Sequence, residues 1–322
     1  NGFTVHKTGV GAIPTTMQAY LYSGNDRLTA GKSLNSSTNN IEFSNVGFKV
    51  AAGSTETVMV KMDVGTTCTA GEVNFELVDS SAVKSTADAV AGDFPLVSET
   101  IGISATNAGT ITIAKNGSVA NPKVGQVGVT ISKFTLNAAT EAAEIEQLGL
   151  YVTGSISGAD VTSLKLYVTG TTDPIAEVDG VNSKDLAQFV LDTPYKIEKG
   201  GTKSFYVTAD MAPGRNADTL KVYIDENTDV VSIGATYGFG MSVTRTAFDG
   251  DSCTSTSGDC SYSVLEGGDI TISSSGPAAK DIAVNAKDVH LMDFSIVSVS
   301  DVTFKNLDIS LTPGSLDATD DD

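Results

Sequence analysis

The chain has 322 residues, of which 40% are hydrophobic and 18% are charged, so it holds enough apolar material for a packed core and is long enough for about two domains. Its formal net charge is −19, with 39 acidic against 20 basic residues, which argues against nucleic acid and anionic membranes because both attract clustered Lys and Arg. The lack of Trp and the abundance of Thr, Ser, Gly, Ala and Val are typical of secreted, β-rich surface proteins. We therefore expect an extracellular, cell-surface location.

No apolar run approaches the roughly 18 residues of a membrane span, so we expect no direct membrane insertion in this stretch. The opening residues, NGFTVHKTGV, lack the apolar centre of a signal peptide. Either a leader has been removed or the chain begins inside a longer one.

Residues 1–108 contain several segments in which apolar and polar residues alternate, as in half-buried strands. These segments are AYLYSG, IEFSNVGFKV, ETVMVKMDV and EVNFELVDS. They match only the later part of the unit that follows, and nothing ahead of Ala19 resembles the opening of that unit. We interpret 1–108 as the later half of a β-sandwich repeat.

Residues 109–266 predict about eight or nine short strands separated by Gly, Asn, Asp and Pro turns at the spacing of a sandwich. We interpret them as one complete repeat. Only AATEAAEIEQLG, residues 138–149, resembles a helix, and because strand patterns flank it we expect a connection with at most one helical turn.

Residues 267–322 repeat the opening of that unit. GDITIS matches GTITIA with a shift of 159 positions, VHLMDFSI matches VTISKFTL with a shift of 160, and FKNLDISL matches IEQLGLYV. The sequence thus predicts an early half-unit at 267–322, ending in the acidic stretch DATDDD.

The strongest repeat joins residues 48–78 to residues 195–225 at a constant shift of 147 positions. Gly53 falls on Gly200, Asp63 falls on Asp210, and alternating apolar positions coincide. A half-sandwich alone exposes an apolar face and unpaired strand edges, so the two half-units need partners. Either the chain is a window in a longer tandem array, or one copy completes the next, head to tail, by strand exchange.

The chain offers few residues for catalysis, and we expect no enzymatic activity. His6 and His290 stand in no metal-ligand spacing such as HExxH, and no serine stands in GxSxG. The Gly-rich stretches GVGA and YGFGMS lack the Lys of a phosphate cradle, so turns explain them.

Two acidic clusters are candidate calcium sites, because calcium prefers several oxygen ligands. One comprises Asp225, Glu226 and Asp229, and the other comprises Asp249, Asp251 and Asp259. Neither has the EF-hand spacing, and solvated acidic turns explain them equally well. We expect no other cofactor.

Cys253 and Cys260 flank the short loop TSTSGD, and we expect a disulfide there in an oxidising compartment, with two free thiols as the alternative. Cys68 has either a partner outside the chain or a buried position. Asn35 and Asn116 begin glycosylation sequons that accept a glycan if the source has the machinery.

The run LKLYVTG, YKIEKGGTKSFYVTADM, DTLKVYID resembles the tandem β-sandwich repeats of bacterial and archaeal cell-surface and S-layer-type proteins. The resemblance implies an all-β chain of immunoglobulin-like or fibronectin-like sandwiches, exported to a coat, stalk or filament. The implied function is a structural subunit whose partners are copies of itself. The alternative is an adhesin or carbohydrate-binding stalk whose loops at 171–186 and 249–262 contact a cell-surface glycan.

Overall fold

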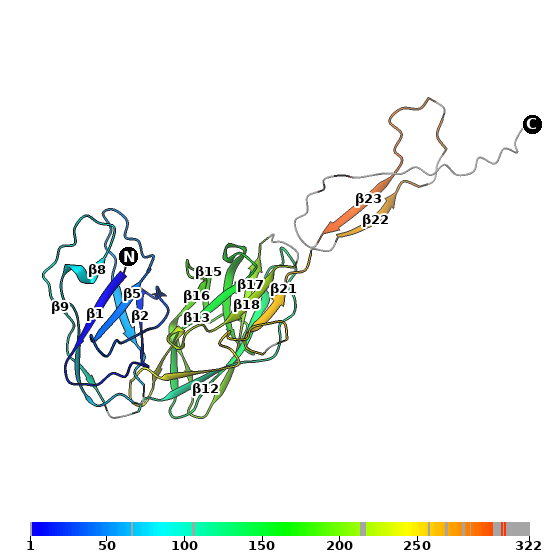
Figure 1. The fold of residues 1–322 in the computed structure, drawn as a ribbon. Helices are drawn as coiled ribbons and strands as arrows, with labels where there is room; N and C mark the ends of the chain where they lie inside the picture. Colours follow the sequence, from blue (N-terminus) through cyan, green and yellow to red (C-terminus); the bar gives the residue numbers. More distant parts are fainter. Residues whose placement is uncertain are drawn as a thin grey trace, which may run out of the picture. The chain divides into compact units, whose positions relative to one another are not determined.

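The computed structural model describes residues 2–65, 67–104, 107–212, 217–256, 258–267, 270–278, 281–283, 285–298, 304 and 306. The described elements are β-strands and short 3-10 helices, which confirms the all-β fold. The chain divides into two compact units, Asn1–Gly267 and Gly268–Asp322. The first unit holds the N-terminal sandwich (β1–β10) and the central sandwich (β11–β21), and the second holds the C-terminal hairpin (β22 and β23; Figure 1).

Two sheets face each other in the central sandwich. One has the order β15-β14-β17-β12-β11-β20, and the other has the order β16-β13-β18-β21 with β19 also paired to β13. The first comprises β11 (Thr110–Lys115), β12 (Val129–Ala138), β14 (Val161–Val168), β15 (Ala176–Gly180), β17 (Thr202–Met211) and β20 (Ser242–Thr246). The second comprises β13 (Ala143–Gly154), β16 (Leu186–Ile197), β18 (Thr219–Tyr223), β19 (Val230–Gly234) and β21 (Ser261–Val264).

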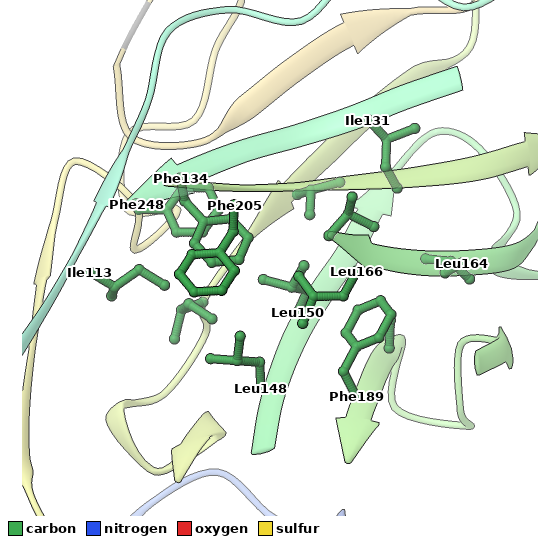
Figure 2. Packing of buried hydrophobic residues seen from close by; sticks show 14 of the residues in the cluster. Ile113, Ile131, Phe134, Leu148, Leu150, Leu164, Leu166, Phe189, Phe205 and Phe248 are labelled. Carbon is green, nitrogen blue, oxygen red and sulfur yellow. The ribbon is translucent and has the colours of Figure 1, made fainter. Parts of the chain in front are cut away.

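The core between these sheets follows from strict alternation along the strands, which turns every second side chain inward. Phe134 of β12 stacks on Phe205 of β17 and on Phe248, with ring centroids 5.5 and 5.6 Å apart. Figure 2 shows these rings gathered together, with Leu148 and Leu150 of the facing sheet nearby. Each such buried side chain contributes about 1.5–3 kcal/mol to folding.

The N-terminal sandwich also has two sheets around a core of its own. The larger sheet comprises β1 (Gly2–Thr8), β5 (Asn40–Ser44), β7 (Gly71–Leu77), β8 (Val83–Lys84), β9 (Leu96–Val97) and β10 (Ile101–Ile103). The smaller comprises β2 (Gln18–Ser23), β3 (Asp26–Arg27), β4 (Lys32–Ser33) and β6 (Val58–Met62). Val5, Leu21, Ile41, Phe43 and Val73 from both sheets meet between them.

Several strands of the two sandwiches correspond. β6 pairs with β2 as β17 pairs with β14, and β1 lies between β5 and β7 as β13 lies between β16 and β18. The short helix η1 (Ser80–Ala82) leads into β8, as η3 (Asn227–Asp229) leads into β19. The 147-residue repeat is therefore a repeat of structure.

The first strand, which lies ahead of Ala19, has a counterpart in the central unit, although not in that unit's opening strands β11 and β12. Val5 pairs with Ile41 of β5, as Leu150 pairs with Ala187 of β16. β1 therefore takes the place of the C-terminal half of β13. The sequence match is short, a shared Thr-Gly at the strand end, and only the pairing makes it clear.

Residues 138–149 differ from the prediction. Instead of a connection with a helical turn, β12 ends at Ala138 and β13 begins at Ala143. The Ala- and Glu-rich letters resemble a helix, but Ala143, Ile145 and Leu148 are buried in the core. Tertiary packing therefore overrides the local helix propensity here.

In the C-terminal hairpin, β22 (Ile270–Gly276) pairs antiparallel with β23 (Asp293–Ser298). The matched stretch FKNLDISL lies mostly outside the described residues, as does DATDDD. In the part of the chain that the structure describes, no helix is long and apolar enough to span a membrane.

Candidate assembly surfaces

The open edge of the N-terminal sandwich is β6. In the central sandwich, β17 lies between β14 and β12, and β11 follows beyond β12. Among the described residues, β6 pairs with β2 alone, and the N-terminal sandwich has no counterpart of β11 or β12. The backbone groups along one side of β6 thus form an unpaired edge, where another strand can add.

The side chains of β6 are also more exposed than those of its counterpart β17. The constant shift of 147 places Val60 on Val207, the same residue type at the same position. Val207 is fully buried, but Val60 is 42% exposed. Both strands have an equivalent neighbour on one side, β2 or β14, but among the described residues only β17 has a strand on the other side, and this difference accounts for the exposure.

The C-terminal hairpin resembles the two strands that β6 lacks. Its residue pairs are Ile270 with Ser298, Ile272 with Ile296, and Ser274 with Phe294. Shifted back by 159 and 160 positions, these become the pairs of β11 and β12. In that sheet Ile111 pairs with Ala138, Ile113 with Leu136, and Lys115 with Phe134. The hairpin therefore reproduces the first two strands of a repeat in the same register.

The apolar face of this hairpin is largely uncovered. Ile272 is 57% exposed where its counterpart Ile113 is fully buried, and Ile296 is 39% exposed where Leu136 is fully buried. Edge strand and hairpin thus each expose the positions that the central sandwich buries.

A third surface, the inter-sandwich junction, joins the N-terminal and central sandwiches through Arg27 of β3. Arg27 Nε donates to Asp229 Oδ1 at 2.8 Å, and Nη2 donates to Asp229 Oδ2 at 3.2 Å and to Asp225 Oδ2 at 2.6 Å. Nη1 donates to the carbonyl of Thr29 at 3.1 Å. Arg27 is 5% exposed and Asp229 is fully buried. A bidentate pair in this geometry fixes both distance and orientation.

Polar contacts surround the Arg27 pair. The Tyr22 hydroxyl lies 3.0 Å from Thr228 Oγ1, and Lys61 Nζ lies 4.0 Å from the centroid of the Tyr22 ring. The Gly31 N–H donates to Glu226 Oε1, and Gln147 Nε2 donates to the carbonyl of Asn25. Asn182 Nδ2 donates to Asp26 Oδ1. These contacts hold η3 and β13 of the central sandwich against β2 and β3.

Burial sets the ionisation of this junction. It raises the pKa of Asp229 to about 6, against the opposing effect of the Arg27 guanidinium. Burial acts to lower the pKa of Arg27, but Asp229 and Asp225 raise it further, so the guanidinium stays charged. Burial also raises the pKa of Tyr20 and of Tyr22. At neutral pH the junction therefore holds an ionised pair.

The first predicted calcium cluster lies inside this junction. Asp225 and Asp229 do converge on one cation, which here is the guanidinium of Arg27, and Glu226 accepts from Gly31. In the second cluster, Asp249 Oδ1 accepts from the N–H of Asp251. Over the described residues, no group of three or more His, Cys, Asp or Glu is placed to hold a metal ion. Calcium at either cluster stays a prediction.

Cys253 and Cys260 form the expected disulfide, and Cys68 is a half-buried free thiol. The sequon residues Asn35 and Asn116 are both exposed, and their glycosylation stays a prediction.

The two histidines each lie beside a polar neighbour on or next to a strand. His6 Nδ1 is 2.8 Å from Asn40 Oδ1, and His290 Nε2 contacts Asp293 Oδ1. Both contacts fit structural roles.

The loop at 171–186, predicted to contact a glycan in the alternative function, lines an open cavity of about 270 Å³ together with Asp26. Asn182 and Gln188 in its wall are already hydrogen-bonded, to Asp26 and Gln147 respectively. Among the described residues that line it, none is aromatic, so it offers a sugar ring no stacking surface. Glycan binding there, or at 249–262, stays a prediction.

No protein-family model and no curated protein matches the sequence. Among solved structures, the seventh ScaB type I cohesin from Pseudobacteroides cellulosolvens matches at 10% identity over 55% of this chain and 100% of the cohesin, with a TM-score of 0.27. A protein from Corynebacterium diphtheriae named as membrane anchored matches at 8% identity over 83% of this chain and 59% of its own, with a TM-score of 0.20. At such identities a similar fold does not indicate a ligand or a partner.

Proposed function

We propose that this chain is a structural subunit of an extracellular assembly, a surface layer or filament, in which partial repeats are completed by strand addition. The single observation that carries the proposal is the match between two deficits. Among the described residues, the edge strand β6 lacks the neighbour that β17 has in β12, and the C-terminal hairpin has the register of β11 and β12 without a sheet to join.

Strand addition supplies both affinity and order. An added strand pairs its backbone groups with the open edge, and its alternate side chains fill core positions. Because edge and hairpin belong to different parts of one chain, the contact is head to tail, and such contacts propagate into open polymers unless they close into a ring. In a longer tandem chain, the same addition joins consecutive repeats.

The inter-sandwich junction supports a load-bearing role. A buried bidentate ion pair resists sliding and rotation of one sandwich against the other, because separating the two side chains leaves each charge buried without its partner. The N-terminal and central sandwiches are therefore joined as one stiff segment. The Cys253–Cys260 disulfide is consistent with an oxidising, extracellular setting.

The test is the mass of the purified 322-residue chain as a function of concentration, measured by sedimentation velocity. We expect species well above the 33.1 kDa chain mass, growing with concentration. Val60→Asp, which puts a charge on the open edge, should remain at the chain mass. Val10→Asp is the matched control, because Val10 is 90% exposed and outside β6, and it should assemble normally. A wild-type chain that stays at 33.1 kDa throughout contradicts the proposal.

A further inference from the structure

We propose that β23 of a second copy of this chain adds antiparallel to β6, with Phe294 opposite Val58, Ser295 opposite Thr57 and Met292 opposite Val60. The sheet β3-β2-β6 is thereby extended to β3-β2-β6-β23-β22. This register deepens the proposed function and rests on it.

The register follows from the central sandwich, where the corresponding strands are already paired. There Phe134 lies opposite Phe205, Thr135 opposite Ser204, and Ser132 opposite Val207. Shifting the β12 residues forward by 160 and the β17 residues back by 147 gives the proposed pairs.

The acceptor side keeps the geometry of its counterpart. Val60 pairs with Leu21 and Val58 pairs with Ser23. In the central sandwich, Val207 pairs with Leu166 and Phe205 pairs with Val168. β6 thus holds the same register on β2 that β17 holds on β14, and its open side presents backbone groups in the same phase.

The hairpin, which donates the added strand, also keeps the register of its counterpart. Its three pairs Ile270–Ser298, Ile272–Ile296 and Ser274–Phe294 match those of β11 and β12 without a slip. A one-residue slip would turn Phe294 and Ile296 to solvent, so burial of these side chains selects the register.

Side-chain sizes across the proposed pairs compensate one another. Val58 is smaller than its counterpart Phe205, which leaves room at the ring of Phe294. At the next inward pair, Met292 and Val60 replace Ser132 and Val207. Further along, Val289 and Met62 replace Val129 and Ala209. Volume lost at one pair is gained at the other two, as a packed core requires.

A second copy of the chain is a suitable occupant, because its hairpin has the register of the strands that complete β17, and both surfaces present exposed apolar residues, Ile272 at 57% and Val60 at 42%. The described residues therefore include both an acceptor edge and a donor hairpin.

The test is cysteine cross-linking between two versions of the full chain in a Cys68→Ser background. One carries Thr57→Cys and the other carries Ser295→Cys; both sites are exposed in the free chain. Opposed residues of antiparallel strands have Cα atoms about 4.5–5.5 Å apart, within the range of a disulfide. The matched control replaces Ser295→Cys by Val297→Cys, on the same face and two residues along, where the Cα atom lies about 7–8 Å from that of Thr57, beyond the usual range of a disulfide.

Mixing the first two chains under mild oxidation should give a linked dimer in at least tenfold greater yield than the control mixture. Equal yields overturn the register. If the chain assembles in sedimentation but this cross-link does not form, the register is overturned and the proposed function stands. If the chain neither assembles nor forms the cross-link, both the register and the proposed function are overturned. A chain carrying both Thr57→Cys and Ser295→Cys that links internally at high dilution, while staying monomeric, overturns addition between copies.

Discussion

The N-terminal and central sandwiches share strand positions and pairings, yet the same valine is buried in one and exposed in the other. Val207 of β17 lies between β14 and β12, whereas Val60 of β6 is paired with β2 on one side and, among the described residues, has no strand on the other. The difference lies in neighbours and not in residue type. An exposed apolar residue at a core position of a repeat thus indicates where the partner strand adds.

The largest predicted effect is the difference in stability loss between aspartate substitutions at Val207 and at Val60. Val207→Asp places a charge in the closed core and should cost about 5 kcal/mol or more, enough to unfold the central sandwich. Val60→Asp should change the stability of the dissociated chain by less than about 1 kcal/mol, because water reaches the site. Thermal unfolding followed by circular dichroism measures both. Equal losses of stability would show that β6 is already covered.

The junction that joins the two sandwiches provides the next prediction. Arg27→Ala leaves Asp229 buried without its cation and should cost about 3–5 kcal/mol in urea unfolding. Adding Asp229→Ala should restore much of that loss, since the stranded charge is removed. The equivalent of Asp229 in the N-terminal sandwich is Ala82, so this turn accepts alanine. A double variant no more stable than Arg27→Ala would contradict a charge-based account.

The disulfide belongs to the central sandwich alone. Cys253→Ser with Cys260→Ser opens a loop with a sequence separation of 7, and chain entropy for so short a loop gives a loss of about 2 kcal/mol. The loss should appear in the unfolding of the central sandwich. Assembly through β6 should be unchanged, and impaired assembly would show that the loop contributes to the interface.

The smallest effect is the pH dependence of the junction. Burial raises the pKa of Asp229 to about 6 from a reference value of 3.8, so the folded chain binds a proton that the unfolded chain releases. This contribution to stability is fully present below about pH 4 and is lost as the pH rises through about 6. The stability of the wild type relative to Asp229→Asn should therefore increase by about 1 kcal/mol from pH 7 to pH 5. A constant difference would contradict the raised pKa.

The sequence predicts those features that repetition or short range makes visible. The shift of 147 identifies β6 with β17, and the later shift identifies the hairpin with β11 and β12. Cys253 and Cys260 are close along the chain, so their disulfide could be predicted from the sequence. The phase of the repeats also suggests the C-terminal hairpin as the partner of β6, and this stays a proposal.

The junction could not be predicted in this way. Arg27 and Asp229 are 202 positions apart, and no periodic pattern connects them. Two weak signals were present: Arg27 is one of few arginines in an acidic chain, and the repeat places Ala82 where Asp229 stands. Because the N-terminal sandwich folds with Ala82 at this position, the sandwich fold itself does not require the carboxylate of Asp229, and a partner outside the central sandwich is expected. The carboxylates of Asp225 and Asp229, which were predicted as calcium ligands, accept hydrogen bonds from that guanidinium, and calcium there stays a prediction.

The most direct test of the central claim is amide hydrogen exchange, compared between dissociated and assembled chain. Completion by strand addition predicts that amides of Val58–Met62 and Asp293–Ser298 become protected as assembly proceeds, with those of β12 and β17 unchanged. Assembly that leaves Val58–Met62 and Asp293–Ser298 exchanging as fast as in the dissociated chain would contradict the claim.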